Sequence, residues 1–126
     1  MHQSHAFSKE FSKIIFGGNV FGWTVDQQQS FNLLDYALEH GIYTIDTADM
    51  YSTWVQGHQG GESETVIGHW LQHKPSHRDK IILISKVGAP LAEDKKGLSK
   101  KYIKQAIEAS LKRLNTDYLD VYLSHY

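Results

Sequence analysis

The sequence predicts an α/β fold in which short parallel strands alternate with helices. Four short apolar runs have the composition of strands: residues 14–16, 42–46, 80–86 and 118–125. Three segments between them repeat apolar residues at helical spacing: residues 27–40, 63–74 and 99–114. A helix between two successive strands makes a crossover connection, so this order of elements predicts a parallel sheet.

The helices are defined by their caps and by their apolar spacing. Asp26 and Gln29 resemble a capping box at the start of the first helix, which ends at Gly41. The second helix begins near Ser63 and stops before Pro75. The apolar residues expected to face the core are Phe31, Leu34 and Leu38 in the first helix and Val66, Ile67, Trp70 and Leu71 in the second.

The third helix has both of its ends marked in the sequence. Ser99 is its predicted N-cap and Asn115 can supply a left-handed end. Its apolar face is predicted to contain Ile103, Ala106, Ile107, Leu111 and Leu114.

The strands differ in the environment that their composition predicts. The run at 14–16 reads as a buried strand, and Gly17-Gly18 after it indicates either a turn, the favoured interpretation, or a close approach of the backbone to another group. The run at 80–86 is dense in Ile and Leu, as in a parallel strand buried on both faces. Residues 49–61 form a long glycine-containing loop of the kind that carries function, and residues 1–11 suggest only a frayed tail or a short hairpin.

Composition limits the classes of function. The 126 residues suffice for one domain, predicted over residues 1–126, and the net charge of −1 favours neither a nucleic-acid nor a membrane partner. The chain has no cysteine, which excludes a disulfide or a thiolate site, and no run approaches the ~20 apolar residues of a membrane span. These features predict a cytoplasmic protein.

Two polar clusters are given structural interpretations. His69 and His73 are four residues apart on a predicted helix, but no third ligand is near in the sequence, so no metal site is predicted. The lysine-rich segment 92–101 could attract a phosphate, although a solvated loop leading into a helix is the favoured interpretation.

Three of the predicted strands end in a polar residue. Asp46, Lys86 and His125 close the runs at 42–46, 80–86 and 118–125, and Tyr51 follows Asp46 by five residues. Side chains alternate along a strand, and the carboxyl ends of parallel strands meet at one edge of a sheet. The three polar side chains are therefore expected to converge beside the tyrosine.

These four residue types together suit the reduction of a carbonyl group. An aspartate keeps a buried lysine cationic, and the ammonium stabilises the phenolate of a neighbouring tyrosine, which makes Tyr51 a usable proton donor. His125 could donate a hydrogen bond that orients the carbonyl oxygen. None of the four residues can deliver a hydride, so the chemistry requires a nicotinamide cofactor.

Each of the four residues also has a structural interpretation. Asp46 could cap a loop, Lys86 could be the solvated end of a strand, His125 could be a core histidine and Tyr51 a packed aromatic residue. For any one residue that interpretation is at least as good as the catalytic one. For the four residues together the structural interpretation is less good than the catalytic one, because three consecutive strands would each have to end in an inward polar residue by accident.

Several motifs resemble the N-terminal half of the aldo-keto reductase family. They are Asp46-Thr-Ala-Asp-Met-Tyr51, Gly61-Glu-Ser-Glu-Thr-Val-Ile-Gly68, Ser85-Lys86 and Ser110-Leu-Lys-Arg-Leu-Asn-Thr-Asp117, followed by Tyr-Leu-Asp-Val-Tyr-Leu-Ser-His125. The resemblance extends from about Ile14 to Tyr126. It implies a TIM-type (β/α)8 barrel that reduces an aldehyde or ketone with NADPH.

The resemblance also assigns roles to residues. It implies that Asp46, Tyr51, Lys86 and His125 form the catalytic tetrad, and that Gly17, Gly18, Asn19 and Asp46 lie near the nicotinamide. A threonine is common in the family where Gly18 stands. Trp23 and Trp54, with His125, occupy positions that line the substrate pocket in the family.

The length of the chain departs from the family pattern. Such a barrel takes about 250 residues or more, whereas this sequence of 126 residues ends with the fourth strand. It therefore reads as a truncated chain, the N-terminal half-barrel, that lacks most of the family's cofactor-binding surface. Three hypotheses follow: a shortened carbonyl reductase, a non-catalytic binding or regulatory subunit, and an inactive remnant. A half-barrel with an open sheet is expected to be unstable alone or to pair with another chain, either a second copy or a complementary half-barrel.

Overall fold

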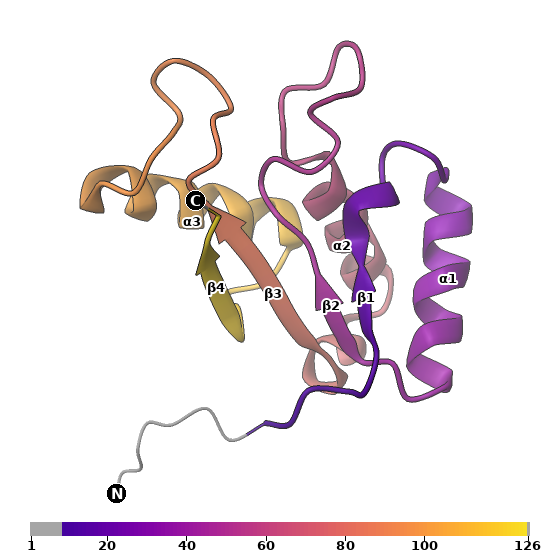
Figure 1. The fold of residues 1–126 in the computed structure, drawn as a ribbon. Helices are drawn as coiled ribbons and strands as arrows, with labels where there is room; N and C mark the ends of the chain where they lie inside the picture. The colour runs from indigo at the N-terminus through magenta and orange to yellow at the C-terminus, as the bar shows by residue number, and fades with distance from the viewer. Residues whose placement is uncertain (1–8, 126) are drawn as a thin grey trace, which may run out of the picture.

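The computed structural model describes residues 9–125, and it shows one parallel sheet with helices between successive strands (Figure 1). The strands β1 (Ile15–Gly17), β2 (Thr44–Asp46), β3 (Ile82–Val87) and β4 (Val121–Ser124) lie side by side in chain order, each parallel to its neighbour. The predicted α/β order is confirmed. The ends of the predicted domain, including most of the segment interpreted as a tail or hairpin, lie outside the described residues.

The helices begin where the sequence predicts caps. In α1 (Gln27–Glu39) the Asp26 side chain accepts a hydrogen bond from the N–H of Gln29, and in α3 (Lys100–Leu114) the Ser99 side chain accepts one from the N–H of Tyr102. Helix α2 spans Glu62–His73. Asn115 ends α3 in the left-handed conformation, with φ of 53°.

The face of α3 that contacts the core differs from the prediction. Ala106 and Leu114 are buried as expected, but Tyr102 and Ser110 are buried with them, whereas Ile103, Ile107 and Leu111 are only half-buried. Apolar spacing could not identify this face because it contains a serine. The hydroxyl of Ser110 has a partner, since it accepts a hydrogen bond from Arg113 Nη2 at 3.3 Å.

The strands start later than predicted, and at β2 a hydrogen bond outside the sheet uses the first residue of the predicted run. The N–H of Ile42 donates to the carbonyl of Ala37 at 2.8 Å and so belongs to the end of α1. Residues Pro75–Lys80 form a 3₁₀ helix, so Lys80 precedes β3. Residues 118–120 precede β4. The predicted burial of the first strand is wrong, because Ile14 and Ile15 are exposed at the edge of the sheet.

The core lies between the sheet and the helices. It is built from fully buried apolar side chains, among them Leu34, Ile45, Ile67, Trp70, Leu83 and Leu114. The opposite face of the sheet, turned to the viewer in Figure 1, is crossed by no helix of the described residues. On that face Ile15 and Leu123 are 46% and 43% exposed. The sheet therefore has one packed face and one open face.

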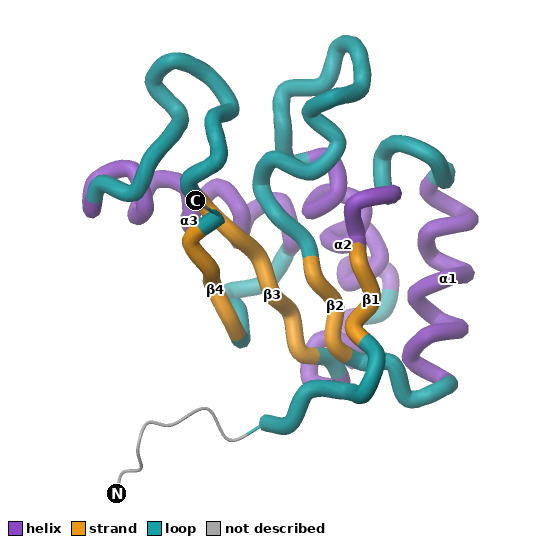
Figure 2. The backbone as a smooth tube through the Cα atoms, viewed as in Figure 1, coloured by secondary structure: helices purple, strands orange, loops and turns teal. Residues whose placement is uncertain are grey.

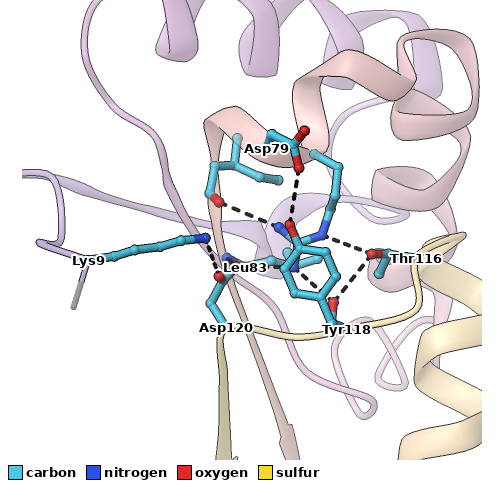
Figure 3. Close-up of polar contacts among 8 residues, drawn as sticks. Lys9, Asp79, Leu83, Thr116, Tyr118 and Asp120 are labelled. Atoms are coloured by element: carbon cyan, nitrogen blue, oxygen red, sulfur yellow. Dashed lines mark hydrogen bonds and ion pairs between the residues drawn. The ribbon is translucent and has the colours of Figure 1, made fainter. Parts of the chain in front are cut away.

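A buried ion pair joins the amino-terminal ends of β3 and β4 (Figure 3). Arg78, only 8% exposed, lies 3.0 Å from Asp120 and also donates to the carbonyl of Tyr118 at 2.8 Å. Burial alone would raise the pKa of Asp120, but hydrogen bonds from Lys9 and from the Leu83 N–H, with the charge of Arg78, hold it below the ordinary value. This network fixes the end of the sheet opposite to the candidate site.

Candidate active site

The carboxyl ends of the strands lie at one rim of the sheet, together with the two longest loops (Figure 2). These loops connect β2 to α2 and β3 to α3, at residues 47–61 and 88–99. In an α/β sheet this rim is the place where side chains from several strands meet.

The pairing of the strands brings three predicted residues to this rim on the open face. Asp46 pairs with Ile84, Ile84 with Val121 and Lys86 with Leu123. Because side chains alternate along each strand, the same face carries Asp46, Lys86 and His125. Lys86 lies two residues beyond the partner of Asp46, and His125 lies two residues beyond the partner of Lys86.

Lys86 is the centre of the site. Its ammonium nitrogen lies 2.6 Å from Asp46 Oδ1, 2.9 Å from the Tyr51 hydroxyl oxygen and 2.9 Å from the carbonyl oxygen of Thr47. The Tyr51 hydroxyl donates a longer hydrogen bond of 3.3 Å to Asp46 Oδ2. The lysine side chain is only 13% exposed, so its charge is neutralised at close range rather than by solvent.

His125 completes the predicted group. Its ring lies edge-on to the ring of Tyr51, with centroids 6.2 Å apart at an angle of 75°, and its backbone N–H donates to the carbonyl of Val87 at 2.7 Å. Burial lowers the pKa of His125, and the charge of Lys86 lowers it further. The charge of Asp46 raises it in part. The neutral imidazole is therefore favoured at neutral pH.

Trp23 and Trp54, predicted to contact substrate, lie beside this group. Their rings meet edge to face with centroids 5.5 Å apart, and the ring of Trp54 is 6.4 Å from that of Tyr51. Both tryptophans are about half exposed. They extend an aromatic wall from Tyr51 toward solvent, which suits contact with an apolar part of a ligand.

Gly17, Gly18 and Asn19, predicted to lie near a nicotinamide, differ in their accessibility. Gly17 and Asn19 are exposed, whereas Gly18 is buried. A Cβ atom at Gly18 would lie 3.0 Å from the carbonyl oxygen of Asp46 and 3.1 Å from Ser63 Oγ. Gly18 therefore begins the turn, which is the 3₁₀ segment Gly18–Val20, and it also lets the backbone approach Asp46 closely.

A chain of hydroxyl groups beneath the site was not predicted from the sequence. Thr47 Oγ1 lies 2.8 Å from Ser63 Oγ, which donates to the carbonyl of Gly18 at 2.7 Å. Thr47 thus contacts Lys86 through its carbonyl oxygen and Gly18 through Ser63. These hydrogen bonds connect the ends of β1 and β2 to α2 at the rim. The only sequence feature that could have indicated them is the presence of Thr47 and Ser63 within the family motifs.

A second unpredicted group lies behind the rim, on the helix side. Glu64 is fully buried, accepts a hydrogen bond from Ser85 at 2.7 Å and pairs with Arg113 at 2.6 Å. Asp49, within the same motif as Asp46 and Tyr51, is buried near this pair. The pKa of Asp49 is raised to about 7, chiefly by burial and further by the charge of Glu64. The charge of Arg113 acts in the opposite direction.

The two histidines of α2 have partners of their own. His69 Nδ1 lies 2.7 Å from Gln27 Oε1, and His73 Nδ1 lies 2.9 Å from the carbonyl oxygen of His69. Across residues 9–125, no three His, Cys, Asp or Glu side chains are grouped closely enough to hold a metal ion. Over the same residues, every helix is too short or too polar to cross a lipid bilayer.

Comparison with known proteins agrees with this arrangement of strands and residues. The model of the aldo/keto reductase family matches residues 13–126, so the chain belongs to that family. Its parallel α/β sheet is accordingly part of a (β/α)8 barrel.

The similar proteins are mostly much longer than this chain. Protein tas of Escherichia coli is 38% identical over 131 residues, which cover 99% of this chain and 38% of that protein. An aldo-keto reductase from Klebsiella pneumoniae, solved in complex with NADPH, is 36% identical with a TM-score of 0.68, and the match covers 89% of this chain and 34% of that one. The chain thus spans little more than a third of these relatives.

A short relative also exists. An uncharacterized 11.2 kDa protein in the crtE 3′ region of Pseudescherichia vulneris is 60% identical over 78 residues, which cover 62% of this chain and 76% of that protein.

Proposed function

We propose that this chain is the N-terminal half-barrel, strands one to four, of an NADPH-dependent carbonyl reductase, with Tyr51 as the proton donor. The observation that carries the proposal is the position of the Lys86 ammonium, within 2.9 Å of the Tyr51 hydroxyl and 2.6 Å of Asp46. A phenol held against an ammonium on an open face of the sheet is suited to general acid catalysis.

Each of the four side chains has a distinct task in this mechanism. The hydroxyl of Tyr51 donates its proton to the oxygen of an aldehyde or ketone, and Lys86 stabilises the phenolate that remains. Asp46 holds Lys86 in place. His125, neutral because of burial and the nearby lysine, donates a ring N–H to the carbonyl oxygen and orients it.

NADPH would supply the hydride when bound. The exposed Gly17 and Asn19, with the carboxylate of Asp46, are the groups of this chain that would contact its nicotinamide. Their accessibility at the rim fits that role, whereas the buried Gly18 would act only by bringing the backbone close to Asp46. Trp23 and Trp54 would contact the substrate beside His125.

The cofactor requires more surface than these residues supply. Half of a barrel rim cannot enclose a dinucleotide, so the isolated chain is expected to bind NADPH weakly or not at all. Activity is expected when a complementary half-barrel is present. We also propose that the protein is cytoplasmic.

The test is to co-express the chain with the C-terminal portion of a full-length relative such as Protein tas, and to follow NADPH oxidation with a panel of aldehydes and ketones. We expect turnover in the co-purified pair and none in either half alone. An assembled pair that binds NADPH and reduces no carbonyl compound would contradict the proposed function.

The open face of the sheet favours a second candidate, a non-catalytic subunit that self-associates. β1 and β4 are unpaired edges among the described strands, and Ile15 on β1 and Leu123 on β4 expose apolar surface. A Probable voltage-gated potassium channel subunit beta from Arabidopsis thaliana is 33% identical over 117 residues, covering 33% of that protein. Light scattering with and without NADPH separates the candidates. A dimer of the chain alone whose size does not change with NADPH supports the second candidate. A monomer that associates only with a complementary half-barrel supports the first.

A further inference from the structure

Ser52, the residue after the proposed proton donor, has an unusual backbone conformation. Its φ angle is 73°, in the left-handed region that side chains other than those of asparagine and aspartate rarely adopt. Among the described residues, Asn115 is the one other non-glycine residue with a positive φ, and it ends a helix, where this conformation is common. Ser52 lies in the loop between β2 and α2 and ends no helix. Its backbone strain therefore needs another explanation.

The hydroxyl group of Ser52 makes a short hydrogen bond that accounts for the strain. Ser52 is fully buried, and its Oγ donates a hydrogen bond of 2.6 Å to the carbonyl oxygen of Phe21. A glycine at this position would adopt the same φ without strain, but it has no hydroxyl group to donate. The hydrogen bond thus offsets the strain, and the contact that it makes between two loops depends on the serine.

Phe21 is a rigid partner for this hydrogen bond. Its side chain is fully buried in the core, and its ring stacks on that of Phe16 with centroids 5.5 Å apart. Its backbone N–H donates to the carbonyl of Gly18 at 3.1 Å. The Ser52 hydroxyl therefore fastens the loop after β2 to a fixed point in the loop after β1.

The hydrogen bonds of the loop show how this attachment acts on Tyr51. The N–H of Tyr51 donates to the carbonyl of Ala48 at 3.3 Å, which closes a turn on one side of the tyrosine. On the other side, the carbonyl oxygen of Ser52 accepts a hydrogen bond of 3.2 Å from the N–H of Val55 and lies 2.9 Å from His58 Nδ1. Tyr51 is thus placed between a closed turn and the attached Ser52.

We infer that Ser52 is a positioning residue for the proton donor. Its hydrogen bond to the Phe21 carbonyl holds the neighbouring hydroxyl of Tyr51 against the Lys86 ammonium. That hydroxyl lies 2.9 Å from the ammonium and makes only a long hydrogen bond of 3.3 Å to Asp46. Tyr51 is half-buried, so packing alone does not fix its ring, and the backbone at Ser52 determines where the hydroxyl lies. The inference rests on the proposed function, in which Tyr51 is the acid.

Three variants separate the hydrogen bond from the backbone strain. Ser52→Gly removes both, and Ser52→Ala removes the hydrogen bond but keeps the strain. Gln56→Gly is the matched control, because it adds backbone freedom at an exposed site of the same loop. In urea unfolding Ser52→Gly should be more stable than Ser52→Ala, so it provides a folded chain that lacks the hydrogen bond.

NMR of the chain reports the contact between the phenol and the ammonium directly. The three N–H groups of Lys86 all have acceptors, which slows their exchange with water, and one acceptor is the Tyr51 hydroxyl. Ser52→Gly and Ser52→Ala should lose the slowly exchanging ammonium signal and the Overhauser effects between the Tyr51 ring and the Lys86 side chain. Gln56→Gly should keep both.

Activity is measured with the chain co-expressed with the C-terminal portion of Protein tas and with a small aldehyde as substrate. Ser52→Gly should lower kcat about tenfold or more while KM and the affinity for NADPH change by less than about twofold, because a displaced acid slows the chemical step. No turnover by the wild-type pair would contradict the proposed function but not the contact, which the NMR signals test without any reaction. A folded Ser52→Gly that keeps the slowly exchanging Lys86 signal, or that turns over like the wild type, would overturn the inference.

Discussion

The stability of the fold should depend on the ionisation of Asp49, and Asp49→Asn tests this. The pKa of this carboxyl is raised from the ordinary value of 3.8 to about 7 in the folded chain, with burial as the main cause. Each unit of difference corresponds to about 1.36 kcal/mol, so the ionised carboxylate costs the folded state roughly 4 kcal/mol as an upper limit.

The sign of the effect follows from which state holds the proton. The unfolded chain loses the Asp49 proton near its ordinary pKa of 3.8, whereas the folded chain keeps it up to about pH 7. The penalty is therefore absent below the unfolded pKa, grows as the pH rises between the two values and is complete above the folded pKa. The asparagine side chain of the variant cannot ionise, so the variant should escape the penalty.

Urea unfolding of the wild type and of the variant at several pH values measures this difference. The stability advantage of Asp49→Asn should widen by about 2.5 kcal/mol between pH 5 and pH 8. Asp94→Asn is the control, because it removes an exposed acid from the loop between β3 and α3. If the wild type and Asp49→Asn show parallel pH profiles, the carboxyl is not buried without partners and the reasoning is refuted.

Two further predictions concern the ends of the sheet. Arg78→Met should destabilise the fold by about 3 kcal/mol because it removes the buried guanidinium that contacts both Asp120 and the carbonyl oxygen of Tyr118. Lys9→Met, which removes a half-exposed partner of Asp120, should cost less than about 1 kcal/mol. Equal losses in urea unfolding would contradict this ranking. By NMR titration, Lys86→Met should raise the pKa of His125 and Asp46→Asn should lower it, because the two charges act on it with opposite signs; shifts in the same direction would show that His125 lies away from the pair.

The order of the elements and the convergence of the polar strand ends could be predicted because they depend on local signals. Apolar spacing identified the helices, and the caps at Asp26, Ser99 and Asn115 marked their ends. A strand has a side-chain period of two, so Asp46 at the end of β2 and Lys86 near the end of β3 share a face once the sheet is parallel.

The starts of the strands could not be predicted from composition, because contacts outside the sheet determine some of them. Ile42 has the composition of a strand residue but closes the end of α1. The segment before β4 is held by Arg78 and Asp120, an ion pair whose members are 42 positions apart in the printed sequence. No local pattern indicates such a pairing.

The burial of Asp49 was missed for a related reason. Asp46 and Asp49 belong to one motif, and composition does not show that the first turns to the open face of the sheet while the second turns toward α3. The loop between β2 and α2 decides this, through the hydrogen bond from Gly61 to the carbonyl of Asp49.

The proton-donor role of Tyr51 is the centre of the account, and single-turnover reduction of an aldehyde by the assembled barrel tests it most directly. Tyr51→Phe keeps the ring that contacts Trp54 and removes only the hydroxyl bonded to Lys86. We predict a loss of the chemical step by at least about 100-fold, with NADPH affinity retained, while Tyr36→Phe, at an exposed site on α1, reacts like the wild type. Equal rates for Tyr51→Phe and the wild type would contradict the account.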